Sequence, residues 1–373
     1  MAKQSFLFIP DISGFTEFVN STEIEHGQHI ISELLEGIIE SNTLGLEVSE
    51  VEGDAVLFYK HRSIPSYSDL VKQVESTFID FHERIKKFES LRICTCGACT
   101  NTINLTLKVI SHIGEIGFTH VHKRQKPYGA DLVRVHRMLK NNIPENEYLL
   151  MSDELARFYQ KDIANWSDAW PELIEAAVPD GNSVYRYAPL TPLKSKVKAP
   201  KVTLTPPLKV AQPRVVEVKI GVHKEKVFSM ILSFDNRALW NKGTKKIMYD
   251  KSRVNRKGAR HDCILQDDTL IQFETIAETR QINALVYGER VLGSKIAKEL
   301  AIYFVVSAGE TPNESIVKAE IHVTPLPIVG WMIKPLILKK MSEGIREQLD
   351  NLKIICEQEA QRESQPLKSA VFQ

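Results

Sequence analysis

Residues 8–16 read FIPDISGFT and residues 51–59 read VEGDAVLFY, and these two stretches decide the fold. The first is the end of a buried strand that runs into a glycine turn, with Asp11 where the strand ends. The second has two short strand-like runs joined by a turn that contains Asp54, which is a hairpin signal. The sequence therefore predicts that the two aspartates lie on neighbouring strands.

The segments around these stretches alternate between strand-like and helix-like patterns. Apolar residues from Ile30 to Ile39 recur at helical spacing, residues 105–118 form a strand pair around a turn, and residues 129–141 are helical. This βαββαβ order predicts an α+β sandwich, a mixed sheet with helices on one face.

Two carboxylates on neighbouring strands suit divalent cations. Mg²⁺ prefers hard oxygen ligands and is usually held by one or two carboxylates together with substrate phosphates. Two such ions stabilise the attacking and the leaving oxygen in an in-line displacement. Asp11 and Asp54 are therefore candidate metal ligands.

Two further motifs complete a family pattern. Residues 107–118, LKVISHIGEIGF, are similar to a strand-turn-strand with an IHTG-like sequence, where His112 and Gly114 match. Residues 128–138, YGADLVRVHRM, are similar to a helix that opens with glycine and ends in a serine-arginine-methionine run. Together with the two aspartate motifs, they resemble the class III adenylate and guanylate cyclases over about residues 4–190. The chain also resembles a bacterial branch of that superfamily, of the DUF2652 type, with a Cys-x-Cys-x-x-Cys insert.

The resemblance implies a role for each matching residue. Asp11 and Asp54 would hold two Mg²⁺ or Mn²⁺ ions, and Arg137 would stabilise charge on the reacting phosphate. The nucleotide-binding positions are Ile12, Ser13, Gly14 and Phe15, whose amides lie near the triphosphate, and Glu50 and Lys126, which select the base. Glutamate at the first base position goes with guanine. In this family a homodimer shares the site, so Arg137 would face the aspartates of a second chain.

Three positions depart from the family pattern. Val133 replaces an asparagine, Lys126 replaces an aspartate or cysteine, and residues 175–187 contain no lysine, with Arg186 as a candidate substitute. Losing one preorganised hydrogen-bond donor to the charge that develops in the transition state typically lowers the catalytic rate about 100- to 1,000-fold. Two hypotheses follow: a divergent nucleoside-triphosphate cyclase that uses GTP, or a non-catalytic dimeric sensor or adaptor with a degenerate cyclase-like domain.

The insert at residues 94–99 reads CTCGAC and is a candidate zinc site. Cys94, Cys96 and Cys99 supply three thiolates, whereas a structural zinc site needs four ligands. The fourth is expected from His120, from His122 or from a partner chain. The alternative is a reduced loop with incidental thiols.

The second half has a different organisation. Residues 191–213 are rich in proline and lysine and lack acidic residues, so we expect an extended linker between a domain at 1–190 and one at 214–358, with a tail at 359–373. Residues 232–243, LSFDNRALWNKG, and the order strand, helix, many strands and long helix resemble the START-like (SRPBCC) superfamily.

That resemblance implies a helix-grip fold and a lipid or other hydrophobic ligand in an apolar cavity. The candidate lining residues, which alternatively fill the core, are Trp331, Ile333, Leu336, Ile337 and Met341.

Composition limits the remaining function classes. A formal net charge of +1 creates no global field toward nucleic acid or an anionic membrane, so neither is an expected partner. The apolar stretch at 324–341 is interrupted by three prolines, a glycine and Lys334, which argues against a membrane span. Five cysteines, three of them clustered, are typical of a reducing compartment, and we expect a cytoplasmic protein.

Overall fold

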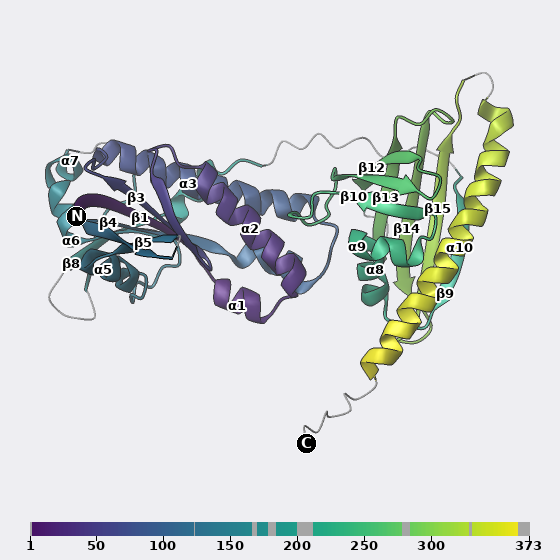
Figure 1. Cartoon of the computed structure of the whole chain (residues 1–373), viewed down its shortest axis with the longest axis horizontal. Coiled ribbons are helices and arrows are strands. Elements are labelled where there is room, and N and C mark those ends of the chain that lie inside the picture. The colour runs from purple at the N-terminus through teal and green to yellow at the C-terminus, as the bar shows by residue number, and fades with distance from the viewer. Residues whose placement is uncertain are drawn as a thin grey trace. The chain divides into compact units, whose positions relative to one another are not determined.

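The computed structural model describes residues 2–122, 124–165, 170–177, 184–199, 212–277, 284–327 and 330–364. The chain divides into two compact units. The first comprises residues 1–90 and 96–201, and the second comprises residues 202–373 with the short segment 91–95. Figure 1 shows that each unit is built around a sheet.

The first unit contains a mixed sheet. Its strands in the described residues are β1 (Lys3–Ser13), β2 (Glu47–Glu52), β3 (Ala55–His61), β4 (Thr106–Val121), β5 (Arg124–Tyr128), β6 (Tyr148–Met151), β7 (Ile174–Ala177) and β8 (Val184–Pro189). The order is β2-β3-β1-β4-β6-β8-β7, and β5 pairs with β4 outside that path. Only the β4–β6 pairing is parallel among the described strands. The arrangement confirms the predicted α+β class and the βαββαβ order.

The helices of this unit follow their apolar spacing. They are α1 (Phe15–Asn20), α2 (Ile24–Glu40), α3 (Tyr67–Leu91), α4 (Gly97–Asn101), α5 (Ala130–Met138), α6 (Asp153–Phe158) and α7 (Gln160–Ala164), with short 3₁₀ turns η1 (Thr102–Asn104) and η2 (Thr191–Lys196). In α2 the buried residues Ile30, Leu34 and Ile38 recur at the spacing that predicted the helix.

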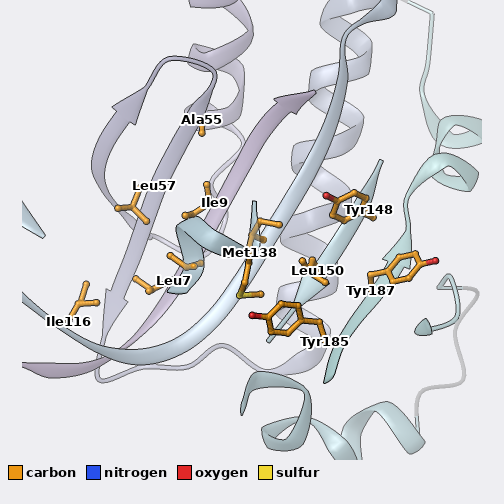
Figure 2. Packing of buried hydrophobic residues seen from close by; sticks show 12 residues of the cluster. Leu7, Ile9, Ala55, Leu57, Ile116, Met138, Tyr148, Leu150, Tyr185 and Tyr187 are labelled. Atoms are coloured by element: carbon orange, nitrogen blue, oxygen red, sulfur yellow. The ribbon is translucent and has the colours of Figure 1, made fainter. Parts of the chain in front are cut away.

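The sheet is buried on both faces. Leu7 and Ile9 of β1 share one hydrophobic cluster with Val135 and Met138 of α5, and Figure 2 shows Met138 over this face. Successive strand residues point to opposite faces, and the alternate residue Phe8 is also buried. The prediction that helices cover only one face was therefore wrong, because α5 covers the face of Leu7 and Ile9 and the face of Phe8 is buried as well.

The start of the expected linker packs on the first unit instead of extending from it. Residues Thr191–Lys196 form η2, and Leu193 and Val197 are buried. Lys86 of α3 donates to the carbonyl oxygen of Val197 at 2.9 Å. Buried apolar residues fix this segment against α3, which its proline and lysine content did not indicate. Residues 200–211 of the expected linker lie outside the described residues.

The second unit contains an antiparallel sheet packed with helices. Its strands are β9 (Arg214–Ile220), β10 (Thr244–Met248), β11 (Arg260–Leu265), β12 (Leu270–Ile276), β13 (Leu285–Leu292), β14 (Glu299–Ala308) and β15 (Ser315–Thr324). The order is β10-β11-β12-β13-β14-β15-β9. The helices are α8 (Lys224–Leu232), α9 (Phe234–Trp240) and α10 (Gly330–Ser364), and α10 lies along β9 and β15 (Figure 1). This architecture is consistent with the predicted helix grip.

The buried stripe of α10 lies further along the helix than the sequence suggested. Ile345, Leu349, Leu352 and Cys356 are buried, at the spacing of one helix face. The helix continues to Ser364, into the segment expected as a tail.

A charged cluster lies inside the second unit. Arg237 of α9 donates from Nη1 to Oε2 of Glu289 at 3.1 Å, and the Tyr287 hydroxyl donates to Oε1 at 2.6 Å. His261 Nε2 lies 3.3 Å from Oε1, and all four side chains are buried. Burial by itself would raise the pKa of Glu289, but the charge of Arg237 and the bonds from His261 and Tyr287 outweigh it and hold the pKa well below its usual range.

Candidate functional site

Asp11 lies on β1, and Asp54 lies in the turn that leads into β3, the strand next to β1. In the register between β1 and β3, Asp11 lies opposite Ala55, the residue after Asp54. The N–H of Ile12 donates to the carbonyl oxygen of Asp54 at 2.9 Å. Gly53, with φ of 62°, makes the left-handed turn just before Asp54. The two aspartates are therefore neighbours across β1 and β3, with Asp54 in the hairpin turn that the sequence predicts.

Both aspartates line a pocket of about 910 Å³. The lining comprises Asp11, Ile12, Ser13, Gly14, Phe15, Thr16, Glu17, Asp54, Lys108, Val133, His136, Arg137, Leu139, Lys140 and Asn146. The pocket thus brings together the aspartates, the turn at 12–15 and Arg137, which the family resemblance assigned to one site. No sequence motif pointed to Lys108, Lys140 or Asn146.

Lys108 is the cross-strand partner of Asp11 in the register between β1 and β4. Its Nζ lies 3.2 Å from Oδ1 of Asp11 and donates to the carbonyl oxygen of Leu139 at 3.4 Å. A charged residue inside an apolar strand needs a partner. The position of Lys108 inside the apolar run LTLKVIS was therefore the sequence feature that could have indicated a buried acidic partner.

The electrostatics of the two carboxylates favour a bound cation. Burial raises the pKa of Asp11, although the charge of Lys108 opposes the shift. Burial also raises the pKa of Asp54, and the negative charge of Asp11 adds to it. A divalent ion relieves both the desolvation and the mutual repulsion. Two carboxylates are hard oxygen donors, so the residues present fit Mg²⁺ or Mn²⁺.

The α5 helix contributes the cation of Arg137 and the apolar side chain of Val133 to the pocket. Arg137 is exposed in the last turn and lines the same pocket as the aspartates of its own chain. Val133, one turn earlier, is 52% exposed and has no side-chain group that hydrogen-bonds a ribose or phosphate. The expectation that Arg137 faces the aspartates of a second chain stays a prediction.

The two expected base-selecting residues pair with each other. Lys126 Nζ lies 3.4 Å from Oε1 of Glu50, joining β5 to β2. Neither residue is among those that line the pocket. Burial raises the pKa of the neighbouring Glu52, and its contact with Glu50 adds to the shift.

The residues of the IHTG-like motif hold α5 in place. His112 is fully buried, with Nδ1 2.8 Å from the Ser152 hydroxyl and Nε2 3.3 Å from Oδ1 of Asp131, in the first turn of α5. A Cβ at Gly114 would lie 2.3 Å from Cγ of Asp131. The motif therefore allows α5 to approach β4 closely.

The three predicted cysteines gather around a histidine that the sequence did not indicate. One ligand atom each from His26, Cys94, Cys96 and Cys99 lies within 4.8 Å of all the others. His120 on β4 and His122 in the following turn are outside this cluster, and His26 occupies the place expected for one of them. His26 is distant in sequence, and only folding brings the first turn of α2 to this loop.

The predicted cavity residues at the start of α10 are largely exposed. Trp331 is 70% exposed, Leu336 is 67% exposed and Ile333 is 41% exposed. Ile337 and Met341 are half-buried. The buried contacts of α10 come instead from the stripe that includes Ile345 and Leu349.

Part of the chain is similar to a described protein family. Residues 31–148 match the model of DUF2652, a protein family of unknown function. An uncharacterised protein of Mycobacterium tuberculosis, Rv2561/Rv2562, is 33% identical over 135 residues. The match covers 36% of this chain and 62% of the relative, less than two thirds of that relative's length.

Solved nucleotidyl cyclases are similar to about half of the chain. The adenylyl cyclase CyaB from P. aeruginosa has 16% identity and a TM-score of 0.35, covering 51% of this chain and 94% of its own. A dimeric guanylyl cyclase domain from Blastocladiella emersonii has 14% identity and a TM-score of 0.36, covering 50% and 96%. The guanylyl cyclase Cya2 has 13% identity and a TM-score of 0.37, covering 51% and 92%.

Among the described residues, no helix combines the length and the hydropathy that crossing a membrane requires.

Proposed function

We propose that the first unit binds a nucleoside triphosphate together with Mg²⁺ or Mn²⁺ in the pocket lined by Asp11 and Asp54. One observation carries this proposal: the pocket combines two desolvated carboxylates with the cations Lys108, Arg137 and Lys140. Carboxylates hold the metal, and basic side chains neutralise the phosphates. A metal–triphosphate complex needs both kinds of group in one place.

Each group in the pocket has a distinct task. Asp11 and Asp54 would hold the ions, which supply charge stabilisation on the phosphates when bound. Arg137 and Lys140 neutralise phosphate oxygens from α5 and the loop that follows it. Gly14 has no Cβ, so the backbone of the turn at 12–15 can come close to a ligand.

The proposed reaction is cyclisation of the triphosphate, with GTP as the substrate suggested by Glu50. The 3′-oxygen forms a bond to the α-phosphorus as the bond to the β-phosphate oxygen breaks. Pyrophosphate leaves, and the proton of the 3′-hydroxyl passes to solvent. Arg137 stabilises the charge on the reacting phosphate.

The test is a product assay on the full chain. Purified protein is incubated with each of the four nucleoside triphosphates and Mg²⁺ or Mn²⁺, and cyclic nucleotide and pyrophosphate are quantified. We expect a cyclic product that Asp54→Ala removes, while a matched change outside the pocket, Glu75→Gln, retains it. Product formation at the same rate in Asp54→Ala would exclude this pocket as the site.

A second candidate is a nucleotide sensor without turnover. It is favoured by Val133, where the family has an asparagine, and by the ion pair that joins the two base-selecting residues Glu50 and Lys126. This candidate predicts metal-dependent binding of a non-hydrolysable triphosphate analogue without any cyclic product. Absence of binding in wild-type protein would exclude both candidates.

The dimer is part of the same proposal, since the family shares its site between two chains. Arg137→Ala and Asp54→Ala each remove a different part of that site. If the site is shared, a mixture of the two variants regains part of the lost activity or binding. If each chain has its own complete site, the mixture regains none.

The second unit is proposed to bind a hydrophobic molecule, on the basis of its antiparallel sheet and long C-terminal helix. A fluorescent fatty acid is a suitable probe. We expect saturable binding by the full chain. Binding that is equally strong after thermal unfolding would show non-specific association.

A further inference from the structure

We propose that His26, Cys94, Cys96 and Cys99 form a structural zinc site. The donor atoms come from the first turn of α2 and from the loop and short helix that follow α3. Cysteines that are close in sequence also lie close in space, so their proximity alone does not indicate a metal site. Here a histidine that is distant in sequence completes a set of four side chains that can bind a metal. Four is the number of protein ligands that a structural zinc ion takes.

The distances agree with one ion held by all four donors. With Zn–S of about 2.3 Å and Zn–N of about 2.0 Å, a tetrahedral site separates sulfur from nitrogen by about 3.5 Å. His26 Nδ1 lies 3.3 Å from Sγ of Cys96 and 3.5 Å from Sγ of Cys99. Nδ1 is therefore the nitrogen that faces the cluster.

The donor chemistry selects the metal. Three thiolates and an imidazole are soft or borderline ligands, and they suit zinc better than Mg²⁺ or Ca²⁺. Four protein donors leave no open position, which is the arrangement of a structural site and not a catalytic one. All five cysteines lie in described residues and none forms a disulfide, so the three thiols are chemically competent.

The surroundings of the cluster hold the ligands in place. Cys96 caps α4, and its Sγ accepts from the N–H of Cys99 at 3.5 Å. Glu23, at the start of α2, accepts from the N–H groups of Gly97 and Ala98 at 3.4 and 3.2 Å. A Cβ at Gly97 would lie 3.1 Å from the carbonyl oxygen of Ser21. A glycine between the cysteines thus lets the loop approach the turn that precedes α2.

The site would fix a segment that supports the pocket. The chain runs from the cysteines through α4 and η1 to Leu105, just before β4. A Cβ at Gly14 would lie 3.5 Å from the carbonyl oxygen of Asn104 and 3.8 Å from the Leu105 side chain. A zinc ion would link this segment to α2. The turn at 12–15 would then pack against a segment that the metal holds in place.

Metal analysis of the full chain tests the proposal. The protein is purified with a reductant and without chelators, and zinc and iron are measured by mass spectrometry. We expect one equivalent of zinc per chain, and a tetrahedral thiolate spectrum when Co²⁺ replaces it. Zinc-depleted protein with five reduced thiols that takes up neither metal would overturn the proposal, as would stoichiometric iron.

Histidine variants identify the fourth ligand. His26→Ala should lower zinc occupancy and alter the Co²⁺ spectrum, whereas His120→Ala and His122→Ala should retain the wild-type stoichiometry and spectrum. Loss of the spectrum in His122→Ala, with retention in His26→Ala, would contradict the assignment. These readouts do not depend on nucleotide binding, so they separate this proposal from that for the pocket.

Discussion

Lys108 Nζ and Asp11 Oδ1 lie 3.2 Å apart, so a cation that binds Asp11 competes with a lysine of the same sheet. The two side chains are mostly buried, and the pairing of β1 with β4 places Lys108 directly opposite Asp11. The same lysine lines the pocket in which phosphates are proposed to bind. We therefore expect Lys108 to oppose binding of the metal alone and to favour the proposed metal–nucleotide complex.

Replacing Lys108 separates these two effects. We expect Lys108→Gln to bind Mn²⁺ alone about fivefold more tightly, because the loss of an ion pair worth about 1 kcal/mol frees Asp11. Its affinity for a triphosphate should fall. A paramagnetic-resonance titration measures free Mn²⁺ directly. Lys140→Gln is the control, since it should weaken triphosphate binding and leave Mn²⁺ affinity unchanged; equal Mn²⁺ affinity in Lys108→Gln would contradict the prediction.

Gly14 and Gly45 form a matched pair for testing the pocket turn. Both have left-handed backbones, with φ of 87° and 61°, so alanine at either position should destabilise the protein by about 1 kcal/mol. A Cβ at Gly45 meets nothing within 4 Å, and Gly45 does not line the pocket. Only Gly14→Ala should weaken nucleotide binding, measured by calorimetry. A similar loss of affinity in Gly45→Ala would show a general effect of stability.

Glu147 should make the stability of the first unit depend on pH. Burial would raise its pKa, but hydrogen bonds from His82 and Lys194 outweigh that effect and lower the pKa. When the pKa of a carboxyl group is lower in the folded state than in the unfolded state, its ionised form stabilises the fold at pH values above the unfolded-state pKa. This contribution is lost as the pH falls through the folded-state pKa. Glu147→Gln should therefore destabilise the protein by about 2 kcal/mol at neutral pH, and by less near pH 4.

Urea unfolding at the two pH values measures this difference. Glu75→Gln is the control, because Glu75 pairs with the half-exposed Lys196 and should change stability by less than about 1 kcal/mol. A deficit of Glu147→Gln that is the same at both pH values would rule out ionisation of Glu147 as the cause.

Arg237 and Glu289 should depend on each other for the stability of the second unit. Removing one member of a buried pair leaves an uncompensated charge and typically destabilises by about 3–5 kcal/mol. We expect Arg237→Met to show a loss of this size, and the double variant Arg237→Met with Glu289→Leu to recover a large part of it. Thermal unfolding of the three proteins decides the matter, and a double variant no more stable than Arg237→Met would refute the coupling.

Local patterns in the sequence were sufficient for the fold class of the first unit but not for which face of the sheet each helix covers. Glycine turns, strand alternation and the helical spacing of Ile30, Leu34 and Ile38 are properties of short segments, and they predicted the βαββαβ order. The face covered by α5 was not predicted, because the residues that it buries, Leu7 and Ile9, alternate with equally apolar Phe6 and Phe8. A strand that is apolar on both faces does not show which element covers each one.

The candidate site was predictable only where residues follow a motif. Asp11, Asp54 and Arg137 each belong to a motif, and the structure brings them to one pocket. Lys108 meets Asp11 through strand register, which the sequence around either residue does not specify. His26 meets the cysteines through the packing of α2 on α4, which the sequence around these residues does not specify, and it was therefore not among the predicted ligands.

The short 3₁₀ turn at Thr191–Lys196 determines where the first unit can be truncated. A chain ended after Pro189 would lose the buried side chains of Leu193 and Val197, and the surface of α3 beneath them would become an apolar patch open to water. Such a fragment would tend to aggregate even if its sheet folds. Ending the chain after Lys198 keeps this cover, which makes it the better boundary for expressing the first unit alone.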